Sequence, residues 1–402
     1  MLLRAASGRR LLLGYGMNVH AGGDVATWER ALAETVAPLR RRLGARGPFG
    51  LAVRLDATGA HELVEDAPRR AALVARHQAE GLLPFTGNAF VAGRFHGGRV
   101  KDAVYAPTWG TPERTAYTLE FARALAAFHG PGAQLSLSTA PGPWKGWRVD
   151  VPLPAARAAA LVETAEGLRR LEEETGVRVR LGLEPEPGCD PETTDETLAW
   201  FRGPLDAAWA HAPEARPYVG VCYDVCHQAV LHEDVATGLE ALLDEGIPVV
   251  KVQLSVAVEL RDPADKAARE ALAGFDEGTW LHQVAAPTAD GVHFAPDLDV
   301  ALADPQLARE QPWRVHFHVP VDRQRLAGGL ATTAPALEAA LDVVARREEI
   351  EHLEIETYSF GALPPADRPD GPDGPLVEGL LGEFRHVLDG LARRGVHVEE
   401  VA

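Results

Sequence analysis

Four acidic or histidine side chains stand at or just after the ends of separate apolar runs. They are Glu184, Asp224, His318 and Glu356. Carboxylate oxygens and imidazole nitrogens form a ligand set that suits Mn²⁺, Mg²⁺, Co²⁺ or Zn²⁺ better than a thiolate-rich set would. These residue types predict a divalent metal site, provided that the four runs converge. Internal ion pairs, or a helix cap in the case of Asp224, are the structural alternatives.

The alternation of side chains along each run indicates which residues share a face. In Trp313–Val319, apolar residues alternate with Arg314, His316 and His318. Two histidines on one inward face are hard to explain by packing, and His318 lies nearer the end of the run. We therefore expect His318 to be the metal ligand, and His316 to orient it or to contact a substrate.

The same alternation argument applies to the acidic residues. Two leucines take the outward face before Glu184, which turns its carboxylate inward, and Pro185 then ends the strand because proline cannot donate to the ladder. Glu356 is likewise turned inward at the end of its run. Asp224 is followed three residues later by His227. This spacing supports a functional role more strongly than the aspartate alone.

Further polar residues are candidates for binding a substrate. Lys251 and Gln253 share one face of the run Val249–Leu254. Gln253 is either a ligand through its amide oxygen or a hydrogen-bonding group for the substrate, and Lys251 either contacts the substrate or neutralises a deeper carboxylate. Amides and aromatic walls suit a small polyhydroxy or ring-bearing ligand. Such side chains follow the first, third and fourth strand candidates: Asn18, His20, Asn88 and Trp144.

Short apolar runs alternate with longer helical patterns along almost the whole chain. This pattern predicts parallel strands joined by crossover helices, and 402 residues suffice for one α/β (β/α)₈ TIM barrel with insertions. We expect a single domain over residues 1–402, with an insertion at 257–312 that forms a hairpin near the barrel mouth. Nine runs are strand candidates, one more than a barrel needs, and the surplus is expected in or beside the insertion. The candidates are Leu12–Asn18, Gly50–Leu55, Leu82–Thr86, Gln134–Thr139, Val179–Glu184, Val219–Asp224, Val249–Leu254, Arg314–Val319 and Leu353–Thr357.

Eight helices are expected between these strands, and three of them open at a proline, which suits a first helical turn. They are Trp28–Leu43, Pro68–Glu80, Pro112–Phe128, Pro154–Thr175, Thr194–Trp209, Val235–Glu245, Thr333–Arg347 and Leu376–Arg394. Active sites of TIM barrels are built at the carboxyl ends of the strands. The polar residues described above are expected to meet there.

The composition argues against several classes of partner. The chain has 58 acidic and 40 basic residues and a net charge of −18, which disfavours binding to nucleic acid or to anionic lipid. Its three cysteines are too few for a disulfide framework. No run approaches the roughly 20 apolar residues of a membrane helix, and the N-terminal leucines are too few for a signal peptide. We expect a cytoplasmic protein.

The arrangement of candidate ligands resembles that of the xylose isomerase-like TIM barrels, which include sugar isomerases, ketose epimerases and endonuclease IV-type enzymes. The resemblance implies that Glu184, Asp224, His318 and Glu356 bind the metal ion. It also implies that the two glutamates act as an acid/base pair and that His227 touches the substrate. One departure is that the strand after Asp224 ends in Gln253, where the epimerases' histidine is expected.

Several phrases together resemble, more narrowly, the metabolite traffic protein EboE family, the TIM-barrel proteins of the ebo gene cluster. This resemblance implies a pathway that exports or processes a metabolite precursor, with other proteins of that pathway as partners. The phrases cover nearly the whole chain: Asn18–His20, Phe85–Phe90, Ser138–Gly142, Cys222–Gln228, Lys251–Ser255, Leu281–Val284, His316–Pro320 and Glu354–Tyr358.

Two functions of different classes follow from these observations. The first is a metal-dependent isomerase- or epimerase-like enzyme that acts on a small polar metabolite, with proton transfer by Glu184 or Glu356. The second is a non-catalytic protein that binds or traffics a metabolite in the same pocket, for which Gln253 is the main argument. Hydrolysis of abasic DNA fits the fold, but it does not fit the acidic charge.

Overall fold

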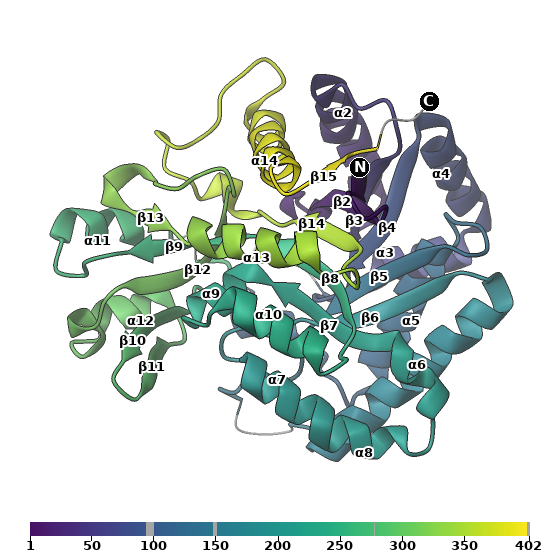
Figure 1. The fold of residues 1–402 in the computed structure, drawn as a ribbon, viewed down its shortest axis with the longest axis horizontal. Coiled ribbons are helices and arrows are strands. Elements are labelled where there is room, and N and C mark those ends of the chain that lie inside the picture. Colours follow the sequence, from purple (N-terminus) through teal and green to yellow (C-terminus); the bar gives the residue numbers. More distant parts are fainter. Residues whose placement is uncertain (94–99, 148–150, 277, 400–402) are drawn as a thin grey trace.

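Eight parallel strands form a closed barrel in the computed structural model, which describes residues 1–93, 100–147, 151–276 and 278–399 (Figure 1). The ladder runs in chain order and closes where Leu12–Tyr15 pairs with His352–Ile355. The predicted TIM barrel is therefore confirmed. Its strands are β2 (Arg10–Gly16), β3 (Phe49–Arg54), β4 (Leu82–Asn88), β5 (Gln134–Thr139), β6 (Arg178–Leu183), β7 (Val219–Asp224), β8 (Val249–Leu254) and β14 (His352–Ile355).

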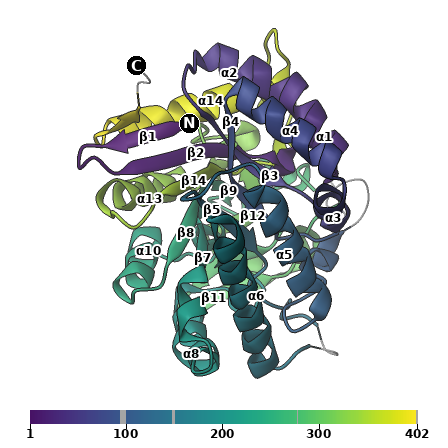
Figure 2. The same ribbon diagram turned by 90° about the vertical axis from the view of Figure 1, so that its right-hand side faces the viewer.

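Helices surround this barrel on its outer side (Figure 2). The predicted helix Pro154–Thr175 is observed with the same ends as α6, whereas two predicted helices contain a π-helical segment. One of these segments contains Pro204, which has no N–H to continue the α-helical ladder. The other helices of the barrel are α1 (Val25–Ala31), α2 (Ala37–Leu43), α3 (Ala57–Glu65), α4 (Ala67–Glu80), α5 (Pro112–Ala126), α7 (Thr194–Trp200), α8 (Asp206–Trp209), α9 (Val225–Val230), α10 (Val235–Asp244), α13 (Ala334–Arg346) and α14 (Pro375–Ala392).

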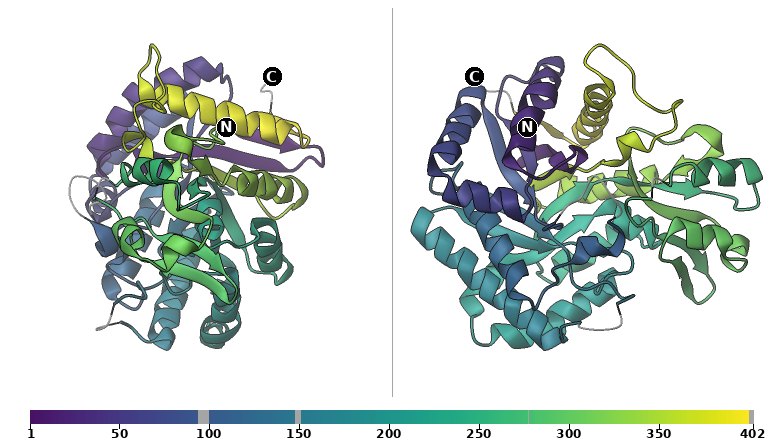
Figure 3. Two further views of the ribbon diagram at one scale, coloured as in Figure 1. Left: turned by 90° about the vertical axis from the view of Figure 1, so that its left-hand side faces the viewer. Right: turned by 180° about the vertical axis from the view of Figure 1, so that it is seen from behind.

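A second, antiparallel sheet is inserted after β8, and Ser255 alone separates β8 from its first strand. The ninth strand candidate, Arg314–Val319, belongs to this sheet and not to the barrel, so the surplus strand lies beside the predicted insertion. Two short helices, α11 (Lys266–Ala273) and α12 (Leu298–Ala303), accompany it, and Figure 3 shows the sheet in front of one end of the barrel. Its strands are β9 (Val256–Leu260), β10 (Val284–Thr288), β11 (Gly291–Ala295), β12 (Trp313–Val319) and β13 (Ala331–Thr332).

Two strands outside the barrel were not expected from the sequence. The N-terminal strand β1 (Leu2–Ala5) pairs antiparallel with the start of β2, and β15 (Val396–Val398) pairs with β1. Both are short, and their pairing joins segments almost 400 residues apart, so no local pattern indicates it. Among the described helices, none combines the length and the apolar character that a bilayer crossing requires.

Gly50 on β3 lies where neighbouring strands approach closely. A Cβ atom added there would lie 2.8 Å from the Phe85 ring and would press on the Leu13 carbonyl oxygen. We expect Gly50→Ala to lower the free energy of unfolding by about 3 kcal/mol, because close-packed interiors accommodate added volume only by strain. Urea unfolding measures this, with Gly130→Ala as the control because its added Cβ meets no atom within 4 Å. Equal stability of the two variants would contradict the prediction.

Candidate active site

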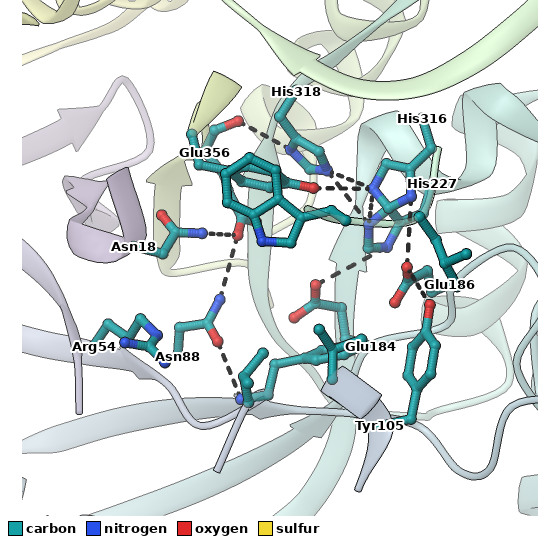
Figure 4. Close-up of a pocket in the computed structure, with 16 residues that line it drawn as sticks. Asn18, Arg54, Asn88, Tyr105, Glu184, Glu186, His227, His316, His318 and Glu356 are labelled. Carbon is teal, nitrogen blue, oxygen red and sulfur yellow. Dashed lines mark hydrogen bonds and ion pairs between the residues drawn. The ribbon is translucent and has the colours of Figure 1, made fainter. Parts of the chain in front are cut away.

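A cavity of about 550 Å³, counted to its open mouth, lies at the carboxyl ends of the barrel strands (Figure 4). The barrel supplies one side of it, and the inserted sheet supplies His316 and His318 on the other side. The described residues that line it are Asn18, Arg54, Asn88, Phe90, Val91, Val104, Tyr105, Glu184, Glu186, His227, Trp280, Leu281, His316, His318, Glu356 and Tyr358.

Asp224 ends β7 and also caps α9, so its two oxygens have different roles. Oδ1 accepts hydrogen bonds from the His227 backbone N–H at 3.0 Å and from the Ser255 hydroxyl at 2.8 Å. Oδ2 is buried and has no hydrogen-bond partner among the described residues. The capping function and a ligand function are therefore compatible, because each uses a different oxygen.

The carboxylates of Glu184 and Glu356 approach that of Asp224, with one oxygen of each within 4.8 Å of the others. Asn18 donates to Glu356 Oε1 at 2.7 Å, and Asn88 donates to the same atom at 3.3 Å. Oε2 of both glutamates is buried without a hydrogen-bond partner in the described part of the chain. Burial, followed by the charges of neighbouring carboxylates, raises the pKa of Glu184 and that of Glu356 well above the ordinary value. The cluster would be stabilised by a cation.

The histidines reach the cavity from two elements. His227 lies in α9, while His316 and His318 lie on β12 of the inserted sheet. Nε2 of His227 and Nε2 of His318 stand 3.9 Å and 4.0 Å from Asp224 Oδ2. Burial lowers the pKa of His227 to about 4, and it also lowers the pKa values of His316 and His318. All three rings are therefore neutral near pH 7, the state in which imidazole binds metals.

Lys251 and Gln253 do not line the cavity, although both face the barrel interior. Lys251 forms a fully buried ion pair with Glu354 and also contacts the Gly87 carbonyl oxygen. Gln253 Oε1 accepts a hydrogen bond from the Cys222 thiol at 3.0 Å. The Lys251–Glu354 pair agrees with the alternative of charge neutralisation for Lys251, and Gln253 pairs in register with Asp224 on the neighbouring strand.

The loop residues expected to bind a substrate divide into two pairs. Asn18 and Asn88 line the cavity and hold Glu356. His20 lies outside it, with Nε2 3.0 Å from the Tyr15 hydroxyl, because the chain enters a 3₁₀ turn directly after β2. Trp144 stacks on Tyr105 at 5.4 Å and supports the cavity wall from behind.

Several lining residues were not expected from the sequence. Arg54 ends β3 and donates to the Gly22 and Gly93 carbonyl oxygens, and the alternation along its strand could have identified it. Glu186 accepts from Tyr105 at 2.8 Å, and burial raises the pKa of Glu186 to about 8. Tyr105, Trp280 and Tyr358 lie in connections whose paths depend on long-range packing, so no local signal identifies them.

The donor set fits a divalent cation. Carboxylate oxygens that are buried without hydrogen-bond partners, facing neutral imidazoles, are costly unless a positive charge compensates them. Glu184, Asp224 and Glu356 form one group of possible ligands. Among the described residues, His318 groups with Asp224 and His227 but not with the two glutamates. The four predicted ligands therefore converge on one region but fall into two overlapping groups.

Comparisons with known proteins identify the fold. Neither protein-family profiles nor curated protein sequences give a match to this chain. Among solved structures, the IolI protein, whose structure is described with a binding zinc atom, has a TM-score of 0.50 and 11% identity, with 96% of this chain and 99% of that chain covered. The chain shares a TIM-barrel fold with the IolI protein.

Two other solved structures of similar extent were found. An L-ribulose 3-epimerase has a TM-score of 0.47 and 12% identity, over 96% of this chain and 95% of that chain. A putative sugar phosphate isomerase/epimerase from Anabaena variabilis has a TM-score of 0.49 and 13% identity, over 96% and 99% of the respective chains.

In this barrel, the candidate ligands follow the strands in order. Glu184 follows the fifth barrel strand, Asp224 ends the sixth and Glu356 follows the eighth. The seventh strand, β8, contributes Gln253. His318 comes from the antiparallel sheet that follows this strand.

Proposed function

We propose that the protein is a metal-dependent isomerase- or epimerase-like enzyme that acts on a small polar metabolite. The observation that carries the proposal is the group of three buried carboxylates, which approach one another within 4.8 Å while one oxygen of each lacks a hydrogen-bond partner among the described residues. The zinc atom named in the structure of the similarly folded IolI protein supports it. We propose Glu184, Asp224 and Glu356 as ligands, with His318 beside Asp224; the metal is one of Mn²⁺, Zn²⁺, Mg²⁺ or Co²⁺.

The bound ion would polarise a carbonyl or hydroxyl group of the substrate. Glu184 and Glu356 come from different strands, so they would reach a substrate carbon from two sides, one removing a proton and the other returning it. Asn18 and Asn88 hold Oε1 of Glu356, while Oε2 is buried without a hydrogen-bond partner among the described residues. His227 and His316, which also line the cavity, are proposed to contact the substrate.

The test measures metal content and proton abstraction together. The metal-stripped protein is reloaded with Mn²⁺ or Zn²⁺, and exchange of carbon-bound hydrogen with D₂O is followed by NMR over a panel of ketoses and their phosphate esters. Glu184→Gln and Glu356→Gln are expected to lower the exchange rate by about 10²- to 10⁴-fold. Exposed Glu348→Gln is the matched control. A protein that binds no ion under any condition would refute the proposal.

A non-catalytic metabolite-binding protein is the second candidate. Gln253 favours it, because the seventh barrel strand offers only a neutral amide, bonded to the Cys222 thiol, where the epimerases that the chain resembles are expected to have a histidine. Saturable binding of a ketose without any hydrogen exchange, unchanged in Glu356→Gln, would favour this function over the enzyme.

The narrower assignments are also proposals. Membership of the EboE family, a role in a metabolite traffic pathway and contacts with other proteins of that pathway are supported by the sequence phrases alone. A cytoplasmic location is supported by three buried cysteines that form no disulfide. Residues 1–402 are proposed to form one domain, since the inserted sheet packs against α9 at the barrel mouth.

A further inference from the structure

Three imidazole rings direct their Nε2 atoms at one point beside the carboxylates (Figure 4). His227 Nε2 lies 3.1 Å from His316 Nε2 and 3.4 Å from His318 Nε2, and the remaining separation, between His316 and His318, is 3.0 Å. All three side chains are buried. Three nitrogens at such separations need an explanation, because they cannot all donate hydrogen bonds to one another.

The opposite nitrogens determine where the hydrogens are. His227 Nδ1 lies 3.1 Å from the Pro185 carbonyl oxygen, and His318 Nδ1 lies 3.1 Å from the Glu356 carbonyl oxygen. A carbonyl oxygen can only accept, so Nδ1 must carry the hydrogen in both rings. A neutral imidazole has one N–H, and therefore both Nε2 atoms present lone pairs.

Gln283 determines the hydrogen position in the third ring. Its Oε1 lies 2.7 Å from His316 Nδ1, while its Nε2 lies 3.1 Å from Glu186 Oε1 and 3.0 Å from the Pro187 carbonyl oxygen. Two acceptors on one side fix the orientation of the amide, so Oε1 is the atom that faces the ring. His316 Nδ1 then donates, and its Nε2 becomes the third convergent lone pair.

The separations match the ligand positions around one ion. Zinc binds imidazole nitrogen at about 2.0–2.1 Å, so two nitrogens of a tetrahedral site lie about 3.3–3.4 Å apart. Asp224 Oδ2, which no described residue hydrogen-bonds, lies 3.9 Å from His227 Nε2 and 4.0 Å from His318 Nε2. It therefore lies beside two of the three nitrogens, and a small movement would bring it within reach of an ion that they share.

We propose that His227, His316 and His318, with Asp224, bind a divalent cation at a second site, and that Zn²⁺ or Co²⁺ suits this nitrogen-rich set best. The site goes beyond the proposed function, which needs only the carboxylate group. It assigns His318 to the histidine group and leaves Glu184, Asp224 and Glu356 as oxygen ligands of the first ion. Asp224 bridges the two.

Metal stoichiometry tests this site independently of any activity. The chelator-treated protein is titrated with Zn²⁺ and Co²⁺, bound metal is counted by mass spectrometry after gel filtration, and the visible absorption of Co²⁺ is recorded. The wild-type chain is expected to bind two equivalents. His316→Gln is expected to lose one equivalent together with the tetrahedral Co²⁺ absorption, whereas Glu356→Gln is expected to lose the other equivalent and keep this absorption.

Two further variants keep the test decisive if His316→Gln folds poorly. Gln283→Leu removes only the acceptor that orients His316, and it is expected to weaken the histidine site by about 10- to 100-fold. His232→Asn is the control, because His232 has a left-handed φ of 60° that asparagine tolerates, and its ring contacts the Ala285 carbonyl oxygen at 3.1 Å, away from the three converging nitrogens.

The outcomes separate this inference from the proposed function. Suppose that the wild type binds one equivalent of metal and that His316→Gln binds the same amount. This result would overturn the histidine site and leave the carboxylate site intact. Suppose instead that the wild type binds two equivalents of metal and that His316→Gln loses one, but that no ketose exchanges hydrogen. The metal counts would then support the histidine site, and the missing exchange would count against the isomerase. Retention of the Co²⁺ absorption in both His316→Gln and Gln283→Leu would also overturn the second site.

Discussion

Lys251→Met is expected to lower the free energy of unfolding by about 3–5 kcal/mol, because it leaves a buried carboxylate without its partner. Lys251 and Glu354 are both fully buried and form an ion pair beneath the cavity. Burial alone would lower the pKa of Lys251, but the Glu354 carboxylate more than offsets it and keeps the ammonium charged. Urea unfolding followed by circular dichroism measures the loss.

A double variant shows whether the ion pair is the cause. Lys251→Met combined with Glu354→Leu replaces both charges by apolar groups, and such replacements of buried pairs are often neutral. The double variant is therefore expected to regain at least about 2 kcal/mol over the single variant. If it is no more stable than Lys251→Met, the loss arises from packing and not from the unpaired Glu354.

Asp224→Asn is expected to abolish binding at both ion sites, although every other ligand substitution affects one. Oδ1 keeps its acceptor role toward Ser255 and the His227 N–H. The new amide NH₂ then occupies the place of Oδ2 and directs N–H donors at the ligands. We expect the affinity for Zn²⁺ to fall by more than about 100-fold at each site, measured by titration against a chromophoric chelator.

Asp234→Asn is the matched control for this substitution. Asp234 caps α10 by accepting from the Thr237 N–H at 2.9 Å, as Asp224 caps α9, but it lies outside the cavity. Both variants should therefore keep their caps, because an asparagine side-chain oxygen accepts as an aspartate oxygen does, whereas only Asp224→Asn should lose metal. Retention of two equivalents in Asp224→Asn would show that its carboxylate is structural.

The alternation of inward and outward residues was sufficient to predict most of the barrel side of the site. Glu184 and Glu356 face the cavity because the apolar residues beside them pack outward, and this is a local property of each strand. For Asp224, its position at the end of a strand was enough to predict that it lies in the site. The pattern did not identify the strand that holds His318 as part of another sheet, because antiparallel and barrel strands alternate alike.

Other parts of the site depend on contacts between distant segments. The segment Leu281–Val284 contributed to the family resemblance, but it gave no role for Gln283. That role arises only because the inserted sheet brings Gln283 between His316 and Glu186. Tyr105 reaches Glu186 across 81 residues of chain. His20, in contrast, has a suitable residue type and position, but a single 3₁₀ turn directs it to Tyr15 and away from the cavity.

The one-residue junction at Ser255 has a consequence for how such a protein can diversify. The three carboxylates come from the barrel. His316 and His318 come from the inserted segment, which begins one residue after β8 and ends just before α13. Changes within that segment can alter the preference for softer ions while the carboxylates keep their geometry. If the proposed sites are correct, metal selectivity and proton transfer would be encoded by separate segments of the chain, linked by the hydrogen bond from the Ser255 hydroxyl to Asp224.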